Sequence, residues 1–137
     1  MNLFGSLEIS SSALRAERTR AEVVASNMAN AETTRTPEGG PYKRKMVVFS
    51  SDRPRFASAM EGTGVKISEV VEDKSDPIRR FEPNHPDADA QGYVAYPDIN
   101  PIEEMTDLMS ATRAYELNAS AVQSTKNMLQ ESLELLK

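Results

Sequence analysis

The apolar positions near the N-terminus follow the period of an α-helix. One row, whose members are seven residues apart, consists of Leu7, Leu14, Ala21 and Met28. Val24 lies on the adjoining row, which polar residues interrupt. This pattern predicts an amphipathic helix within residues 1–34. Its polar gaps suit a helix with several different neighbours better than an isolated coiled coil.

A second periodic stretch covers the C-terminal part of the chain and is longer. Asn100 can cap a helix, Pro101 suits its first position, and Glu103 lies where the partner residue of a capping box belongs. The apolar row is Leu108, Tyr115, Val122, Leu129 and Leu136. A neighbouring, mixed row is Met105, Thr112, Ala119, Lys126 and Leu133. Because neither Gly nor Pro follows Pro101, we expect residues 100–137 to form an amphipathic helix longer than about 50 Å.

The segment between these stretches, residues 35–99, contains five of the six glycines and seven of the eight prolines. Residues 43–49 and 65–71 are rich in β-branched side chains and predict strands. Residues 77–83 and 92–97 are shorter candidates bounded by Pro or Gly, which favours edge positions. We expect an irregular, β-rich middle segment or arm, because a core built from so few residues is marginal by itself.

The predicted fold class is therefore mainly α with a small β-containing middle. The two terminal helices are expected to form an antiparallel, coiled-coil-like pair. The simplest consequence is a helix hairpin closed within one chain. Two such patchy stripes bury little apolar surface, however, and terminal helices that need neighbours from other chains are a natural route to a helical, tubular assembly.

Composition and charge exclude several classes of protein. The 137-residue chain has a formal net charge of −5, which argues against a nucleic-acid partner. It has no cysteine, so a disulfide framework and a thiolate metal site are excluded. No stretch approaches the ~20 apolar residues of a transmembrane segment. The first residues lack the basic region and apolar core of a secretory signal, so export would need a signal-independent route.

One cluster of side chains has the composition of a metal or acid–base site. His85, Asp87 and Asp89 lie within "NHPDADA". A calcium loop needs further ligands, including a bidentate Glu, and the prolines on either side of His85 favour a rigid turn. We therefore expect no metal, no cofactor and no catalytic residue, and no enzymatic activity. A metal-dependent enzyme that uses these three side chains is the alternative reading.

Two stretches resemble a known family. "ASNMANAETT", residues 25–34, is similar to the end of the first helix in bacterial flagellar axial proteins, the group of rod, hook and hook–filament junction proteins. "PNHPDADAQGYVAYPDINPIEEMTDLMSATRAYELN", residues 83–118, resembles more specifically the proximal rod proteins of the flagellar basal body. The likeness covers nearly the whole chain and is weakest across residues 50–76. Asp98 departs from it, because an Asn is usual at that position.

The resemblance implies a structural, non-enzymatic subunit of the proximal rod. Family members pack their terminal helices into the inner tube of a torque-transmitting shaft that encloses an export channel. The implied partners are other proximal rod proteins, the distal rod protein, copies of the chain itself and the flagellar type III export apparatus. The implied location is the rod within the periplasmic space, reached without a cleaved signal peptide.

On this basis we expect an assembly interface on both helices. Its predicted residues are Leu7, Leu14, Val24, Asn27, Met28, Asn30, Met105, Leu108, Arg113, Tyr115, Asn118, Val122, Leu129, Leu133 and Leu136. Tyr115 can fill the seam of a helix hairpin or anchor one subunit on the next, and the resemblance favours the anchor. The alternative from another class is a soluble helical-hairpin adaptor that binds one partner through its C-terminal helix.

Overall fold

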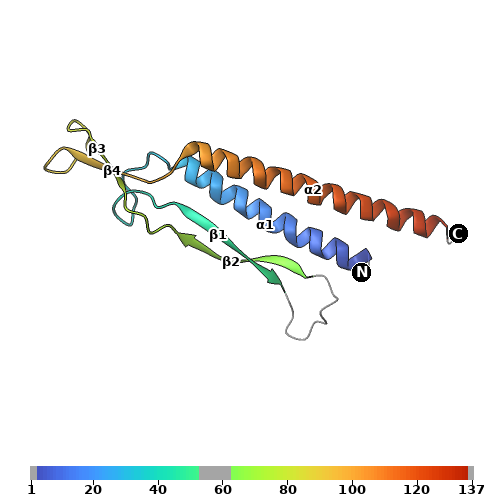
Figure 1. The fold of residues 1–137 in the computed structure, drawn as a ribbon. Helices are drawn as coiled ribbons and strands as arrows, with labels where there is room; N and C mark the ends of the chain where they lie inside the picture. The colour runs from blue at the N-terminus through green and yellow to red at the C-terminus, as the bar shows by residue number, and fades with distance from the viewer. Residues whose placement is uncertain (1–2, 53–62, 136–137) are drawn as a thin grey trace.

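The computed structural model describes residues 3–52 and 63–135, which form two long helices and two β-ribbons. Helix α1 spans Leu3–Ala29 and helix α2 spans Pro101–Glu134. Figure 1 shows the two helices lying side by side and antiparallel, with one ribbon along α1 and the other beyond the end where α2 begins. The predicted antiparallel helix pair and β-containing middle are confirmed.

Helix α2 begins as its sequence predicts. The Asn100 side chain accepts the backbone N–H of Ile102 at 3.1 Å, and Pro101 occupies the first turn, where its missing N–H has no cost. Glu103 differs from the predicted capping box, because its carboxylate accepts the side-chain amide of Asn100 at 3.3 Å. With 34 residues, α2 is about 51 Å long. No helix among the described residues is long and apolar enough to cross a bilayer.

The face of α2 that packs on α1 is centred on small and polar residues. Its most buried members, Glu104, Ala111 and Thr125, are seven or fourteen residues apart, and Asn118 lies half-buried on the same row. Half-buried apolar residues flank this row: Leu108, Val122 and Leu129. Tyr115 is 42% exposed. The apolar row predicted from the sequence, which includes Leu108 and Tyr115, therefore lies beside the contact between α1 and α2 and not at its centre. Small side chains such as Ala111 at the centre allow the two helix backbones to approach closely.

Helix α1 lies between α2 and the first ribbon, and contacts both. Its buried apolar residues are Ala16 and Val24. Toward the ribbon, the Ser12 hydroxyl accepts the backbone N–H of Val65 at 2.9 Å and donates to the carbonyl of Ile9 at 2.7 Å. Gly64 lies against Ser12, so closely that a Cβ atom there would fall 2.7 Å from Ser12 Oγ. A larger residue at position 64 would thus separate the ribbon from the helix.

Four strands form two antiparallel pairs. Strand β1, Lys45–Asp52, pairs with β2, Gly64–Glu72, with Lys45 opposite Glu72 and an irregularity between Val48 and Phe49. Strand β3, Ile78–Phe81, pairs with β4, Tyr93–Tyr96, with Ile78 opposite Tyr96 and Phe81 opposite Tyr93. All four strands fall within or next to the stretches that the sequence predicts. Each sheet has only two strands, so each ribbon depends on packing against its surroundings.

Candidate assembly interface

A polar junction holds both helices and the start of β1 together. The Asn27 side chain donates from Nδ2 to the backbone carbonyl of Lys45 at 2.8 Å and accepts the N–H of the same residue on Oδ1 at 2.9 Å. It thus pairs with Lys45 as a neighbouring strand would. Oδ1 also accepts the Tyr42 hydroxyl at 3.2 Å. With these bonds the buried amide is satisfied, and the first residue of β1 is fixed to the end of α1.

Glu104 joins α2 to this junction. Its Oε2 accepts Asn27 Nδ2 at 3.0 Å and its Oε1 accepts Arg44 Nε at 2.6 Å. Asn27 and Glu104 are each only 1% exposed, so the carboxylate depends on these partners for its stability. Burial lowers the pKa of Arg44, but the hydrogen bond and the charge of Glu104 outweigh it and raise that pKa above its ordinary value. Arg44 is therefore charged when it pairs with the buried carboxylate of Glu104.

A second pair of ionic contacts extends the junction along the helices. Arg20 Nη2 donates to Asp107 at 3.3 Å, which links the middle of α1 to the first turns of α2. Arg44 Nη2 lies 3.9 Å from the other oxygen of the same carboxylate. The charges of α1, α2 and the loop before β1 thus alternate in sign across the contact. This arrangement sets the lengthwise position of one helix against the other.

The outward face of α2 carries an apolar stripe opposite the junction. We define the α2 outer stripe by four residues: Ile102, Met105, Met109 and Leu117. Their exposed fractions lie between 52% and 74%. The spacing of the first three, at i, i+3 and i+7, puts them on one side of the helix, away from the buried row of Glu104 and Ala111. A helix that packs one side on α1 and exposes apolar residues on the opposite side is suited to pack against a second neighbour.

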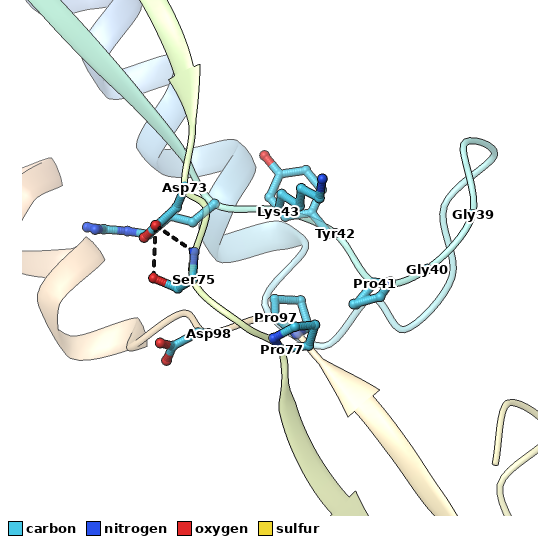
Figure 2. Close-up of a pocket in the computed structure, with 11 residues that line it drawn as sticks. Gly39, Gly40, Pro41, Tyr42, Lys43, Asp73, Ser75, Pro77, Pro97 and Asp98 are labelled. Atoms are coloured by element: carbon cyan, nitrogen blue, oxygen red, sulfur yellow. Dashed lines mark hydrogen bonds between the residues drawn. The ribbon is translucent and has the colours of Figure 1, made fainter. Parts of the chain in front are cut away.

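A cavity of about 220 Å³ lies where the loop after α1 meets the ends of both ribbons. Figure 2 shows the residues that line it. Pro41, Pro77 and Pro97 line it with apolar rings. At its rim Asp73 accepts the hydroxyl of Ser75 at 2.9 Å and its N–H at 3.0 Å. These bonds hold the pKa of the Asp73 carboxyl below its ordinary value. The polar groups of the rim thus order the link between the ribbons.

The candidate metal-site residues His85, Asp87 and Asp89 lie in a turn, where their side chains make hydrogen bonds within the chain. His85 Nδ1 accepts the backbone N–H of Asp87 at 3.1 Å. Asp87 accepts the Thr34 hydroxyl at 2.8 Å and pairs with Arg35 Nε at 3.2 Å. Within residues 3–52 and 63–135, no three metal-ligating side chains gather in one place. The His85–Asp87 segment therefore ties the turn before β4 to the loop after α1.

Comparison with known proteins finds relatives that match this chain over all or nearly all of its length. The chain is 45% identical to the flagellar basal-body rod protein FlgC of Bacillus subtilis, over all of both chains. It is 37% identical to the protein of the same name from Borreliella burgdorferi, over all of this chain and 99% of that one. Against FlgC of Salmonella typhimurium the identity is 38%, over 98% of each chain. The chain belongs to the FlgC family of flagellar basal-body rod proteins.

Family profiles match the two ends of this FlgC-family chain. The profile described as "Flagella basal body rod protein" matches residues 7–35, which include most of α1. The profile described as "Flagellar basal body rod FlgEFG protein C-terminal" matches residues 90–135, which include β4 and α2. The matched segments thus contain both helices of the seam, and with them Asn27 and Glu104 of the junction.

The structure separates the predicted interface residues into three groups. Val24 and Asn27 are buried within the chain. Partly covered residues are Leu7, Leu14, Met28, Asn30, Leu108, Asn118, Val122 and Leu129. Exposed residues are Met105, Arg113, Tyr115 and Leu133. Leu136 lies outside the described residues. The buried members can affect assembly only through the fold, whereas the exposed members are accessible to a neighbouring subunit.

Sequence reasoning missed several residues of these sites. Ile102, Met109 and Leu117 belong to the outer stripe, and the i, i+3, i+7 spacing from Ile102 was the signal that could have found them. Glu104 was also missed. A charged residue in the first turn of a helix ordinarily faces solvent, and its partner Arg44 lies 60 residues earlier in the chain. Nothing in the local sequence marks that pair.

Proposed function

We propose that this protein is a structural subunit of the proximal rod of the flagellar basal body, with no enzymatic activity of its own. Membership of the FlgC family supports the rod assignment. The charges at the start of α2 and in the His85 turn are used in internal hydrogen bonds and ion pairs, which suits a structural role. The proposal is consistent with the elongated pair of helices that forms most of the molecule.

The observation that carries this proposal is the outer stripe of α2. One side of α2 packs on α1, while the opposite side exposes two methionines, an isoleucine and a leucine. Exposed apolar stripes of this kind mark protein–protein contacts. A contact that joins one side of a subunit to a different side of the next propagates into a helical assembly when the rotation between subunits does not close a ring. Tyr115 and Leu133 are also exposed on α2 and would be accessible to a further neighbour.

In such a tube the terminal helices of many copies would surround a central export channel. Torque would pass between subunits through many weak helix contacts, while the Asn27–Glu104–Arg44 junction keeps each subunit rigid. The proposed partners are other proximal rod proteins, the distal rod protein and further copies of this chain. The flagellar type III apparatus would deliver the chain to the periplasmic rod without cleavage of a signal peptide.

The test is to replace Met109 by Glu in a bacterium whose own gene for this protein has been exchanged for the variant. Met109 is more than half exposed, so the free energy of unfolding of the isolated chain should change by less than about 0.5 kcal/mol. Swimming and the yield of complete basal bodies should fall sharply, because a charge then enters an apolar contact.

Met109→Leu is the matched control, because it keeps an apolar side chain of similar volume and should swim as the parent does. Normal swimming by the Met109→Glu variant would contradict the role of the outer stripe. Absence of the protein from purified basal bodies, together with a stable one-to-one complex in the cell, would overturn the rod proposal in favour of the helical-hairpin adaptor.

A further inference from the structure

The two faces of the β3–β4 ribbon differ in exposure. On the inner face, Val94 and Tyr96 are buried. The register places Phe81 opposite Tyr93 and Arg79 opposite Ala95, and these four residues share the other face. We call them the ribbon outer face. Phe81 is 63% exposed and Tyr93 is 41% exposed, so two large rings lie together on the surface of a short ribbon.

The two rings are held in place before any partner arrives. They meet edge to face with centroids 5.3 Å apart. Phe81 rests against Gly92, where a Cβ atom would lie only 2.9 Å from the ring, and the φ of +83° at Gly92 also favours glycine. Asp89 Oδ1 accepts the N–H of Tyr93 at 2.9 Å and fixes that strand end. The "DADAQGY" segment thus builds a rigid aromatic anchor, the kind that dominates binding energy in interfaces.

Arg79 supplies a positive charge beside the rings. Other charges of the ribbon are engaged: Arg80 stacks on Tyr96 at 4.5 Å, and Glu82 accepts the Tyr96 hydroxyl at 2.9 Å. Within the described parts of the chain, Arg79 makes neither a hydrogen bond nor an ion pair, and it acts on Asp89 only through space. One exposed face thus carries two aromatic rings and a guanidinium that is unpaired among the residues described. This composition is typical of the core of an interface, and the positive charge favours an acidic partner.

We propose that the ribbon outer face of one copy docks on the α2 outer stripe of a second copy of this chain. This inference rests on the proposed rod function. It names the β3–β4 ribbon of a neighbouring copy as the element that covers the α2 outer stripe. Methionine sulfur packs favourably on aromatic rings, so Met105 and Met109 suit Phe81 and Tyr93. Glu116 is exposed and, within the described residues, is without an ion pair. It can therefore receive Arg79.

The spacings on the two surfaces agree. Glu116 lies seven residues beyond Met109 on the same side of α2, about 10 Å along the helix axis. Arg79 lies two residues from Phe81, about 7 Å along the strand, and its long side chain covers the difference. Both surfaces also lie at the same end of the molecule, because β4 leads directly into α2 (Figure 1). Neighbouring copies that lie side by side would therefore present the ribbon of one to the stripe of the next, in a contact between two different surfaces.

The absence of native cysteine permits a direct test by disulfide cross-linking. Two differently tagged chains, one with Ala95→Cys and one with Thr106→Cys, are expressed together in cells that lack the native gene. Ala95 lies on the ribbon outer face and Thr106 borders the stripe, so the anchor residues stay intact. After oxidation of isolated basal bodies, we expect a cross-link between the two tags. Ser124→Cys is the matched control, because it lies on the same side of α2 about 27 Å further along.

The outcomes are distinguishable. Incorporation of both chains without a cross-link, or an equal cross-link to position 124, would overturn this docking and leave the proposed function standing. Absence of the chains from basal bodies would overturn the proposed function and the docking with it.

Charge exchange gives a second measure of the same contact. Arg79→Glu and Glu116→Arg should each reduce swimming-zone area severalfold, because each places two like charges at the proposed contact. The double variant should recover most of the loss, because it restores an opposite pair. Lys74→Glu, an exposed change of the same sign outside the ribbon, should have no such effect and no rescue by Glu116→Arg. Additive losses in the double variant would contradict the pairing.

Discussion

At the scale of single residues, the buried amide of Asn27 has the most consequential environment in the chain. It contacts the backbone of Lys45 twice and the carboxylate of Glu104 once, and so joins three segments that are distant in sequence. The pair of Glu104 and Arg44 is buried on the Glu side, where loss of any partner leaves a charge without compensation. Removal of such a residue lowers stability mainly because its hydrogen-bond partners then stay buried without a partner.

Asn27→Ala is therefore expected to reduce the free energy of unfolding by about 2–4 kcal/mol. The substitution leaves the N–H and C=O of Lys45 and an oxygen of Glu104 without their partner. Urea denaturation of the purified chain measures this as a lower midpoint with an unchanged slope.

Asn127→Ala is the matched control, because Asn127 is exposed and bonds only Gln123 on its own helix. Its cost should stay below about 0.5 kcal/mol. Equal midpoints for the two variants would show that the junction adds nothing to stability.

The carboxyl of Asp89 provides a prediction for pH. Hydrogen bonds from the N–H groups of Tyr93 and Gln91 hold its pKa below the ordinary value. A depressed folded-state pKa means that this carboxylate stabilises the turn above the ordinary pKa of an Asp, about 3.9, and that the contribution is lost as the pH falls through the lower folded value. The amide proton resonances of Gln91 and Tyr93 should shift together, with a midpoint below about 3.9.

The same titration of an Asp89→Asn variant is the control and should show no such transition at those two amides. A midpoint at or above the ordinary value in the parent chain would mean that the two backbone hydrogen bonds do not form in solution.

At the scale of elements, the seam between α1 and α2 is narrow because small residues form its centre. Ala111 is completely buried and faces α1. A side chain of greater volume there has no space to occupy, and overpacking of a buried position typically costs about 1–3 kcal/mol. The closeness of the two helices therefore depends on alanine at this position.

Ala111→Leu should accordingly lower the midpoint of thermal unfolding of the isolated chain, with the loss of about 1–3 kcal/mol expected for overpacking. Ala119→Leu makes the same chemical change at an exposed position of the same helix, and it should alter stability by less than about 0.5 kcal/mol. A parent-like midpoint for Ala111→Leu would mean that the helices separate easily and that the seam is not closely packed.

The elements themselves were predictable from the sequence, and the contacts between them were less so. Hydrophobic period located both helices, and Asn100 with Pro101 marked the start of α2 correctly. A search for periodic apolar residues ignores polar ones. It therefore favoured the row of Tyr115 as the one that makes helix contacts, although the polar row of Glu104 and Thr125 is more buried. The burial of Glu104 depends on an arginine far away in the chain, and such long-range pairing leaves no local pattern.

At the scale of the whole molecule, the chain is elongated and its core is small. The buried apolar side chains are few among the described residues: Ala16, Val24, Val94, Tyr96, Pro97, Ile99 and Ala111. Large apolar residues are exposed on α2 and on both ribbons. In the proposed rod, such a molecule would gain stability by association, because each neighbour would bury surface that the single chain leaves in water.

The pairing of α1 with α2 also determines the order in which the chain can fold. The junction joins Asn27 to Glu104 across 77 residues, and Arg20 meets Asp107 across 87. Contacts of such high sequence separation form late, after the entropic cost of closing a long loop. On the proposed export route, a chain that leaves a narrow conduit with either end first cannot complete its main contact until the other helix has emerged. Its fold would therefore be completed at the place of delivery and not on the way there.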